Sequence, residues 1–298
     1  MQIYIKQAVE ACPIKTVFIN LYGENPYMSK RKAACSDFAN VDVNSYNNFL
    51  CMKEEKMNSQ ILIDDLKKWN ITLSDRQVQQ FMDYYALLVE WNSFMNLTAI
   101  TEFEDVCKKH FVDSLAVVNA ISFEELSTDN LSLIDVGTGA GFPGIPIAIV
   151  FPNLQVTLLD SLNKRIKFLN TVIEKLALSN CTTIHGRAED YAKPSLLRES
   201  FDLCVSRAVA NLSTLSEYCM PYVKVGGRFV SYKSEKISEE AKMAERAIAV
   251  LGGIVKDQVQ LCLPGTDMYR NIFVIQKEKS TPKKYPRKAG IPSKEPIA

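Results

Sequence analysis

The sequence predicts an α/β protein with a mainly parallel central sheet flanked by helices. Short apolar runs with the length of buried strands recur along residues 123–278, and helical patterns separate them. Strands that alternate with helices form βαβ units, which build a parallel sheet with helices on both faces. The chain has 298 residues, 47% of them apolar and 23% charged, so it can bury a sizeable core.

Residues 1–56 do not share this patterning. Apolar residues there follow neither helical nor strand periodicity, asparagines crowd residues 40–48, and a basic cluster occupies residues 29–32. We expect a poorly ordered extension. A basic arm is the functional alternative, and a translation start at Met52 or Met57 is a third interpretation.

Residues 57–122 predict a small N-terminal helical region. Ser74 and Gln77 fit a capping box, in which each side chain pairs with the backbone amide of the other residue. Apolar residues then recur at spacings of three and four through residues 78–89. A second helical stretch of this kind is expected over residues 102–120.

The alternating strands and helices fill residues 123–278. Strands are expected at residues 131–136, 155–160, 182–185, 201–206, 227–232, 254–261 and 271–277. Helices are expected at residues 163–178 and 235–251. Right-handed crossovers place the ligand crevice of such a sheet at the carboxyl ends of its strands, where the strand order reverses.

Residues 279–298 form a basic tail. From Lys277 to Glu295 the chain carries seven basic and two acidic residues. Prolines exclude a regular helix there, and they stand at Pro282, Pro286, Pro292 and Pro296. We therefore expect the tail to be extended and mobile when it is not bound to a partner.

Composition argues against several classes of protein. Eight scattered cysteines without a C-x-x-C pair and only two histidines argue against structural zinc and favour free thiols in a reducing compartment. No run of 18 uncharged apolar residues predicts a transmembrane helix, and the first ten residues do not resemble a secretory signal. We expect a cytoplasmic protein with no metal and no membrane contact.

The most informative motif is the glycine-rich run from Asp135 to Gly144, which stands where the first strand ends and a helix begins. Gly137, Gly139 and Gly141 can adopt positive φ and let a ligand lie against bare backbone. The helix start beyond them offers free amides to a negative group of the ligand. The run therefore predicts a cofactor site.

Asp160 closes the second strand, 19 residues after Gly141, where a carboxylate can accept hydrogen bonds from ribose hydroxyls. Residues 139–144 match the dinucleotide fingerprint G-x-G-x-x-G, so NAD is one candidate. Asp135, just before the glycines, could receive a cationic amino group and would repel a pyrophosphate. For this reason we favour S-adenosylmethionine over NAD.

Two further clusters follow later strands. Ala188 and Glu189 come after the third strand, where a backbone amide and a carboxylate could meet an adenine edge. Arg207 follows the fourth strand and should face the reacting region. The alternatives are a solvated acid at a helix start for Glu189, and an ion pair or helix cap for Arg207.

In these motifs the sequence resembles the RsmG (GidB) family, bacterial methyltransferases of 16S ribosomal RNA. The resemblance covers residues 57–298 in order. It rests on WN at 91–92, NLT at 96–98, HFVDS at 110–114, DVGTGAGFPGIP at 135–146, LLDSLNKRIKFL at 158–169, GRAE at 186–189, SRAVA at 206–210 and YPRKAGIP at 285–292. It implies a class I S-adenosylmethionine-dependent methyltransferase fold and methyl transfer to N7 of a guanine.

The resemblance implies cofactor contacts by Gly137, Phe142, Ala188, Glu189 and Arg207. The chemistry above adds Asp135, Gly139, Gly141 and Asp160. Arg207 is the candidate for positioning substrate or cofactor, and no catalytic residue is assigned. Guanine N7 carries a free lone pair, so its methylation needs no general base.

The implied partner, 16S ribosomal RNA in the small subunit, requires positive surface, because basic side chains neutralise phosphates. The candidate RNA-binding residues are Lys164, Arg165, Lys283, Lys284, Arg287 and Lys288. Aromatic residues on the predicted helices, Tyr84, Tyr85 and Trp91, could stack on RNA, but their helical spacing favours a place in the core. The family match suggests a structural role for His110 with Asp113. We expect a monomer.

Three alternatives stay open: a methyltransferase of another substrate, a ribosome-binding protein that holds the cofactor only as a ligand, and an NAD-dependent oxidoreductase. The sequence contains no Asn-Pro-Pro-Tyr, Asp-Pro-Pro-Tyr or Pro-Cys motif. Methylation of exocyclic amines and of cytosine C5 is therefore unsupported.

Overall fold

The structure, a computed structural model, describes residues 59–207, 210–234 and 238–297. The described residues all belong to the unit Asn58–Ala298. The expectations for residues 1–56 lie outside the described residues. So do Ala208 and Val209, which follow Arg207 in the cluster after the fourth strand.

Seven strands form one sheet in the order β3-β2-β1-β4-β5-β7-β6. Neighbouring strands pair in parallel except β7, which is antiparallel to β5 and β6. The strands are β1 (Ser132–Val136), β2 (Gln155–Asp160), β3 (Cys181–His185), β4 (Phe201–Arg207), β5 (Val223–Lys233), β6 (Gly253–Cys262) and β7 (Tyr269–Lys277). This is the class I methyltransferase topology, so the predicted fold class is confirmed. The strand order reverses between β1 and β4, which places the ligand crevice at their carboxyl ends.

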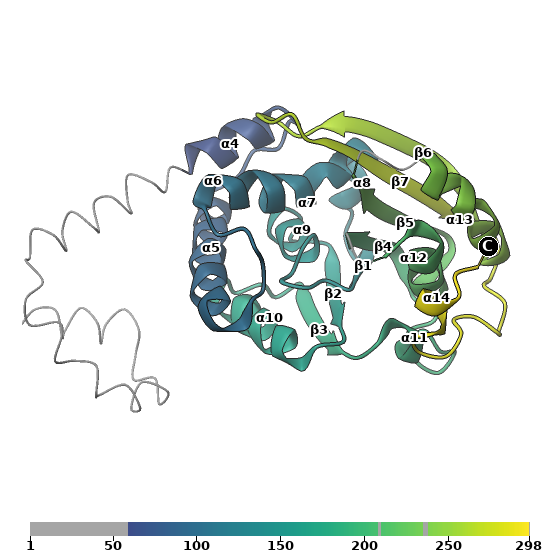
Figure 1. Ribbon diagram of the computed structural model, residues 1–298. Helices are drawn as coiled ribbons and strands as arrows, with labels where there is room; N and C mark the ends of the chain where they lie inside the picture. The colour runs from purple at the N-terminus through teal and green to yellow at the C-terminus, as the bar shows by residue number, and fades with distance from the viewer. Residues whose placement is uncertain (1–58, 208–209, 235–237, 298) are drawn as a thin grey trace, which may run out of the picture. The chain divides into compact units, whose positions relative to one another are not determined.

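Helices cover both faces of the sheet (Figure 1). The described α-helices are α4 (Gln60–Lys67), α5 (Asp75–Met95), α6 (Phe103–Val106), α7 (Asp113–Leu115), α8 (Phe123–Leu126), α9 (Gly144–Val150), α10 (Asn163–Lys175), α11 (Ala188–Tyr191), α12 (Leu212–Cys219), α13 (Ser238–Val250) and α14 (Ile291–Lys294). Helices α9 and α10 pack on β2, and α10 also packs on β3. On the other face α12 packs on β4 and α13 on β6, with α14 against α12.

Helix α5 begins with the predicted capping box, which is confirmed. The Ser74 side chain accepts the Gln77 amide, and the Gln77 side chain accepts the Ser74 amide at 2.9 Å. Gln77 also donates to the carbonyl of Ile149 at 2.8 Å, and Gln80 donates to that of Leu176 at 2.8 Å. These two amides tie α5 to the ends of α9 and α10, so the N-terminal helical region lies directly against the layer that carries the glycine loop.

The helical stretch expected over residues 102–120 is present as residues 103–119, but its helix type changes along the way. After α6 the chain widens into a π-helix, η3 (Cys107–Val112), then continues as α7 and the 3-10 helix η4 (Ala116–Asn119). A π-turn inserts one residue into the helical ladder and often accompanies a functional site. Here it aims the Lys109 carbonyl at Arg207, which donates to it at 3.1 Å. The π-turn thus accompanies a contact with a residue 98 positions away, and the periodicity of apolar residues within 102–120 does not predict such a contact.

Residues 279–297 are not a free extended segment, because they dock on the protein and include a short helix where the prolines predict none. Pro292 occupies the second position of the short helix α14, where a proline lacks no intrahelical hydrogen bond. The tail packs on α12, a helix that the sequence analysis did not predict. A second 3-10 helix, η5 (Met220–Tyr222), connects α12 to β5.

The described residues contain neither a membrane-spanning helix nor a side-chain cluster suited to a metal ion. In residues 59–207, 210–234 and 238–297, no helix is long and apolar enough to cross a membrane. In the same residues, no group of three or more His, Cys, Asp or Glu side chains is arranged to hold a metal ion.

Candidate active site

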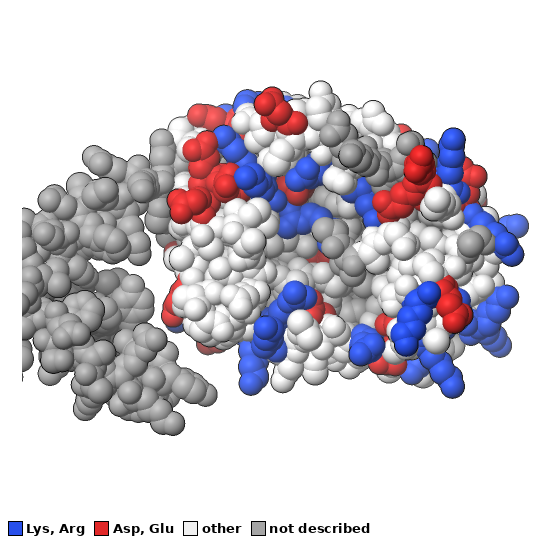
Figure 2. All heavy atoms as spheres, viewed as in Figure 1, with Lys and Arg blue, Asp and Glu red and all other residues white. Residues whose placement is uncertain are grey.

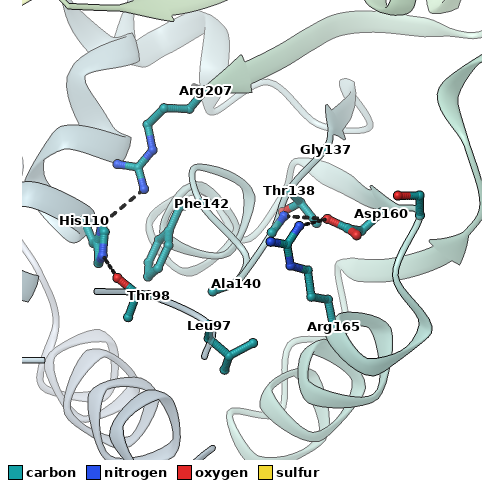
Figure 3. Close-up of a pocket in the computed structure, with 12 residues that line it drawn as sticks. Leu97, Thr98, His110, Gly137, Thr138, Ala140, Phe142, Asp160, Arg165 and Arg207 are labelled. Carbon is teal, nitrogen blue, oxygen red and sulfur yellow. Dashed lines mark hydrogen bonds and ion pairs between the residues drawn. The ribbon is translucent and has the colours of Figure 1, made fainter. Parts of the chain in front are cut away.

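A pocket of about 420 Å³ opens at the carboxyl ends of β1, β2 and β4. This volume lies within the range of sites that hold drug-sized ligands. The lining residues are Leu97, Thr98, His110, Gly137, Thr138, Gly139, Ala140, Phe142, Asp160, Ser161, Arg165 and Arg207. Figure 3 shows Phe142 and His110 on one side of the pocket, with Asp160 and Arg165 on the other. The lining thus joins the glycine loop, the end of β2 and the end of β4.

The glycine loop presents its backbone because its glycines take left-handed conformations. Gly137 has φ +73° and Gly139 φ +64°, and both line the pocket. Asp135 shapes the loop from behind: its Oδ2 accepts the Thr138 hydroxyl at 2.7 Å and the Gly144 amide at 2.8 Å. Burial raises the pKa of Asp135 to about 7, against the lowering effect of these two hydrogen bonds.

This placement of Asp135 differs from the expectation that it meets an amino group of the cofactor. The side chain is fully buried and lies outside the pocket lining, as does Gly141. Gly141 instead meets the helical region, because a Cβ there would lie 2.6 Å from the Tyr84 hydroxyl. Tyr84 is fully buried and donates to the Ala140 carbonyl at 2.5 Å, in keeping with the preference for a core position.

Asp160 lines the pocket with its carboxylate already held in place. Its Oδ1 accepts the Leu162 amide at 2.8 Å, and its Oδ2 accepts the Gly139 amide at 3.0 Å. Arg165 donates to the same Oδ2 at 3.2 Å. The carboxylate therefore ties the end of β2 to the glycine loop, and its orientation is fixed before any ligand arrives.

The rings of Phe142 and His110 form the side of the pocket opposite Asp160 (Figure 3). The ring of Phe142 stacks on His110 with 4.5 Å between centroids, and the Arg207 guanidinium lies 5.2 Å from its centroid. Such a guanidinium contact with a ring face is favourable by about 0.5–2 kcal/mol. His110 Nε2 lies 2.9 Å from the hydroxyl of Thr98, whose amide is fixed at 2.9 Å by the Asn92 side chain. Asn92 belongs to the WN motif and Thr98 to the NLT motif. Through Thr98, both motifs hold the His110 ring at the pocket.

His110 is held neutral. Burial, and then the positive charge of Arg207, lower its pKa to about 4. Its Nδ1 lies 3.3 Å from Arg207 Nη2 and 3.1 Å from the Lys109 carbonyl, and these two contacts favour opposite tautomers. Arg207 can only donate, and it also supplies a donor to the Lys109 carbonyl. We therefore assign the proton to Nε2, which donates to Thr98.

Arg207 belongs to a cluster that the sequence analysis recognised only in part. Its Nη1 donates to Asp113 Oδ2 at 2.9 Å, and Arg270 Nε donates to Asp113 Oδ1 at 2.8 Å. Asp113 is 3% exposed, so two guanidinium groups share one buried carboxylate. Neither Arg270 nor Thr98 was predicted as a site residue. The NLT motif was a signal for Thr98, whereas Arg270 stands in an ordinary strand pattern.

Ala188 and Glu189 lie near the pocket but outside its lining. The Gly186 amide, two residues earlier, donates to the Asp160 carbonyl at 3.0 Å, which places the start of α11 beside the end of β2. Glu189 is largely buried, and its Oε1 accepts the Gly290 amide at 2.9 Å. The solvated acid considered for Glu189 is thus not what the structure contains.

The predicted RNA-binding residues divide into two groups. Lys164, Lys283, Lys284 and Lys288 are exposed. Arg165 is engaged with Asp160, and Arg287 binds Glu217 with 2.7 Å between Nη2 and Oε2. Figure 2 shows Lys and Arg atoms inside the hollow of this face and along its lower right margin. Asp and Glu atoms border the same hollow above, so its margin carries both charges, while Arg287 is used within the protein.

The comparison with protein families agrees with these motifs. Residues 77–268 match the family model GidB, described as rRNA small subunit methyltransferase G. The chain belongs to the GidB family. All twelve pocket-lining residues fall within the segment that matches the GidB model, and the tail lies beyond it.

Curated relatives carry the name ribosomal RNA small subunit methyltransferase G. The protein of Lachnoclostridium phytofermentans is 52% identical over 235 residues, which cover 79% of this chain and 96% of that protein. The protein of Limosilactobacillus reuteri is 52% identical over 242 residues, which cover 81% of this chain and all of the relative.

Solved structures give weaker similarities. A SAM-dependent methyltransferase from Aquifex aeolicus is 15% identical with a TM-score of 0.39, and the match covers 55% of this chain and 96% of that one. The M. jannaschii TYW2 structure in complex with AdoMet is 15% identical with a TM-score of 0.44, and the match covers 55% of this chain and 76% of that one.

Proposed function

We propose that this protein transfers a methyl group from S-adenosylmethionine to N7 of a guanine in 16S ribosomal RNA of the small ribosomal subunit. One observation carries the proposal. In a member of the GidB family, a pocket at the strand-order reversal combines bare glycine backbone, a fixed carboxylate at the end of β2 and an arginine at the end of β4. These are the features that an adenosyl cofactor and a nearby acceptor require.

The residues present fit this cofactor. Gly137 and Gly139 offer approachable backbone, and the Asp160 carboxylate is placed to accept from ribose hydroxyls. Phe142 and Arg207 close the opposite side, while Ala188 and Glu189 follow β3 beside it. When bound, the cofactor supplies an electrophilic methyl group on a sulfonium.

The protein's own contribution is alignment and exclusion of water. Guanine N7 has a free lone pair and no proton to remove, so the reaction needs no general base. Holding two reactants in line can reduce a barrier by about 7–11 kcal/mol. Arg207, clamped by Asp113, is the residue that we assign to positioning.

RNA binding in this proposal uses exposed lysines. Lys164 lies in the first turn of α10, where its Nζ also donates to the Met95 carbonyl at 3.2 Å, and Lys283, Lys284 and Lys288 lie on the tail. They would neutralise phosphates, while an unpaired base enters the pocket. We further propose that the protein acts as a monomer in the cytoplasm, which size-exclusion chromatography with light scattering and cell fractionation can test.

Transfer of labelled methyl groups onto undermethylated small subunits tests the function directly. We expect one labelled guanine per 16S RNA, with the label released as 7-methylguanine. Arg207→Ala should abolish most of the transfer, while Arg246→Ala on the exposed face of α13 should not. No transfer by the unaltered protein, or label on another base or atom, would refute the proposal.

A further inference from the structure

The tail lies docked along α11 and α12. Arg287 makes a bidentate pair with Glu217, which is fully buried in α12. Further along, Thr214 donates to the Pro292 carbonyl at 3.0 Å and Ser213 to the Ile297 carbonyl at 2.5 Å. A bidentate arginine–carboxylate pair is a strong and directional contact. Arg287 therefore acts as a latch for the tail rather than as a free basic group.

The other end of the tail is fixed by the loop before β4. Arg198 donates to the carbonyls of Thr281, at 2.5 Å, and Tyr285, at 2.7 Å. The Thr281 amide donates to Glu199 Oε1 at 2.7 Å. Residues 281–297 are thus held at both ends, and the segment between them has a defined path.

Gly290 lies within that path and meets the cofactor side of the molecule. Its φ of +83° turns the chain so that its amide donates to Glu189 Oε1 at 2.9 Å. Glu189 is 8% exposed. The preceding residue, Ala188, is fixed as well, because the Tyr222 hydroxyl donates to its carbonyl at 2.6 Å. The tail thus supplies one of the restraints on the start of α11.

We infer that the docked tail sets the affinity for the cofactor, because the Gly290 amide positions the Glu189 carboxylate. The inference rests on the proposed function, in which Glu189 contacts the cofactor. A hydrogen bond to a carboxylate restricts the rotation of the side chain, so the cofactor does not have to order it on binding. Gly290 is then a positioning residue, although it lies 101 positions away in the sequence.

Two substitutions at the same position differ in whether an amide still reaches Glu189. Gly290→Pro removes the N–H and cannot adopt the positive φ of residue 290, so it withdraws the donor from Glu189. Gly290→Ala keeps the N–H and can adopt the left-handed conformation at a cost of about 1–2 kcal/mol. A Cβ at residue 290 would meet nothing within 4 Å, so Gly290→Ala adds no overlap. The affinity for S-adenosylhomocysteine, measured by calorimetry on the full chain, should weaken about three- to tenfold in Gly290→Pro. It should stay within about twofold of the original value in Gly290→Ala.

A double-mutant cycle with Glu189→Ala tests the route of the effect. In the Glu189→Ala background, Gly290→Pro should cause no further loss of affinity. In methyl transfer, Gly290→Pro should raise the KM for the cofactor and leave kcat unchanged, whereas a merely structural role would lower the melting temperature without that separation.

The possible results distinguish failure of this inference from failure of the proposed cofactor contact at Glu189. If Glu189→Ala weakens binding and Gly290→Pro does not, the inference is wrong and the proposed cofactor site stands. Equal losses in Gly290→Pro and Gly290→Ala, or a full further loss in the Glu189→Ala background, also overturn it. If Glu189→Ala binds the cofactor normally, the proposed contact of Glu189 fails and the inference fails with it.

Discussion

The Arg207 guanidinium is bound by the Asp113 carboxylate, with 2.9 Å between Nη1 and Oδ2. The contact joins the end of β4 to the helix that follows the π-turn. Arg270 binds the same carboxylate from β7, so the cluster carries two positive charges and one negative charge. The position of Arg207 in the pocket therefore depends on a residue that does not line it.

Asp113→Asn should destabilise the protein strongly, because it leaves two enclosed guanidinium groups without a counter-charge. Breaking a buried ion pair from one side costs about 3–5 kcal/mol of unfolding free energy, and we expect the lower end since both arginines keep some exposure. Urea unfolding measures this. Asp105→Asn removes an exposed partner of Lys109 and should cost less than about 1 kcal/mol. Equal losses would contradict the assignment of Asp113 as the anchor.

His110 should make stability depend on pH. In the unfolded chain its imidazole takes up a proton near the ordinary pKa of about 6.5. In the folded protein, burial and Arg207 lower that pKa to about 4. The stability that His110 contributes is therefore complete above pH 6.5 and is lost as the pH falls toward 4, by about 2–3 kcal/mol. Urea unfolding at pH 7 and pH 4.5 should show this loss, and His110→Gln should lack that part of it.

Nitrogen NMR provides a direct check on the same residue. The sequence holds only two histidines, so the spectrum of His110→Gln assigns the His110 signals by their disappearance. We expect a neutral ring with the proton on Nε2 at pH 6. A ring that titrates near pH 6.5 would contradict its enclosure by Phe142 and Arg207.

The strands were predictable because their signal is local. Residues 155–160 were expected as a strand and form β2 with the same bounds, since a buried strand is a continuous apolar run that Asp160 closes. The helical stretch expected over residues 102–120 was also found, but its π-turn was not predictable. That turn precedes Asp113, whose partner Arg207 is 94 residues away in the sequence. Periodicity contains no information about such a partner.

In the site, too, the sequence predicts the residues that belong to a local motif and misses those that depend on a distant partner. Gly137, Gly139 and Asp160 line the pocket because one short motif and one strand end determine them. Arg270 was missed since it reaches Asp113 from 157 residues away. The charge of Arg287 predicts an RNA contact because the sequence does not reveal that the buried Glu217 binds this arginine. Long-range ion pairs decide which basic residues remain free.

The free lysines of the tail should carry salt-dependent RNA affinity. Replacing Lys283, Lys284 and Lys288 together with Gln leaves the latch at Arg287 intact, because their side chains are exposed. The slope of log affinity against log salt should fall by about 0.7–0.9 for each phosphate that a lysine no longer neutralises. Cofactor affinity and melting temperature should not change. Lys242→Gln on α13 is the control, and an unaltered slope in the triple variant would exclude the tail from the RNA interface.

The glycine loop allows stability and cofactor binding to be separated. Alanine at Gly141, Gly139 or Gly226 costs about 1–2 kcal/mol for the left-handed backbone that all three adopt. Only at Gly141 would the new Cβ also overlap neighbours, with 2.6 Å to both the Tyr84 hydroxyl and Ile145 Cγ1, so Gly141→Ala should lose a further ~1–3 kcal/mol in urea unfolding. Gly139→Ala should match Gly226→Ala in stability, yet it should weaken S-adenosylhomocysteine binding, because its methyl group enters the pocket. Equal cofactor affinity in Gly139→Ala and Gly226→Ala would mean that the cofactor does not lie against the backbone of the loop.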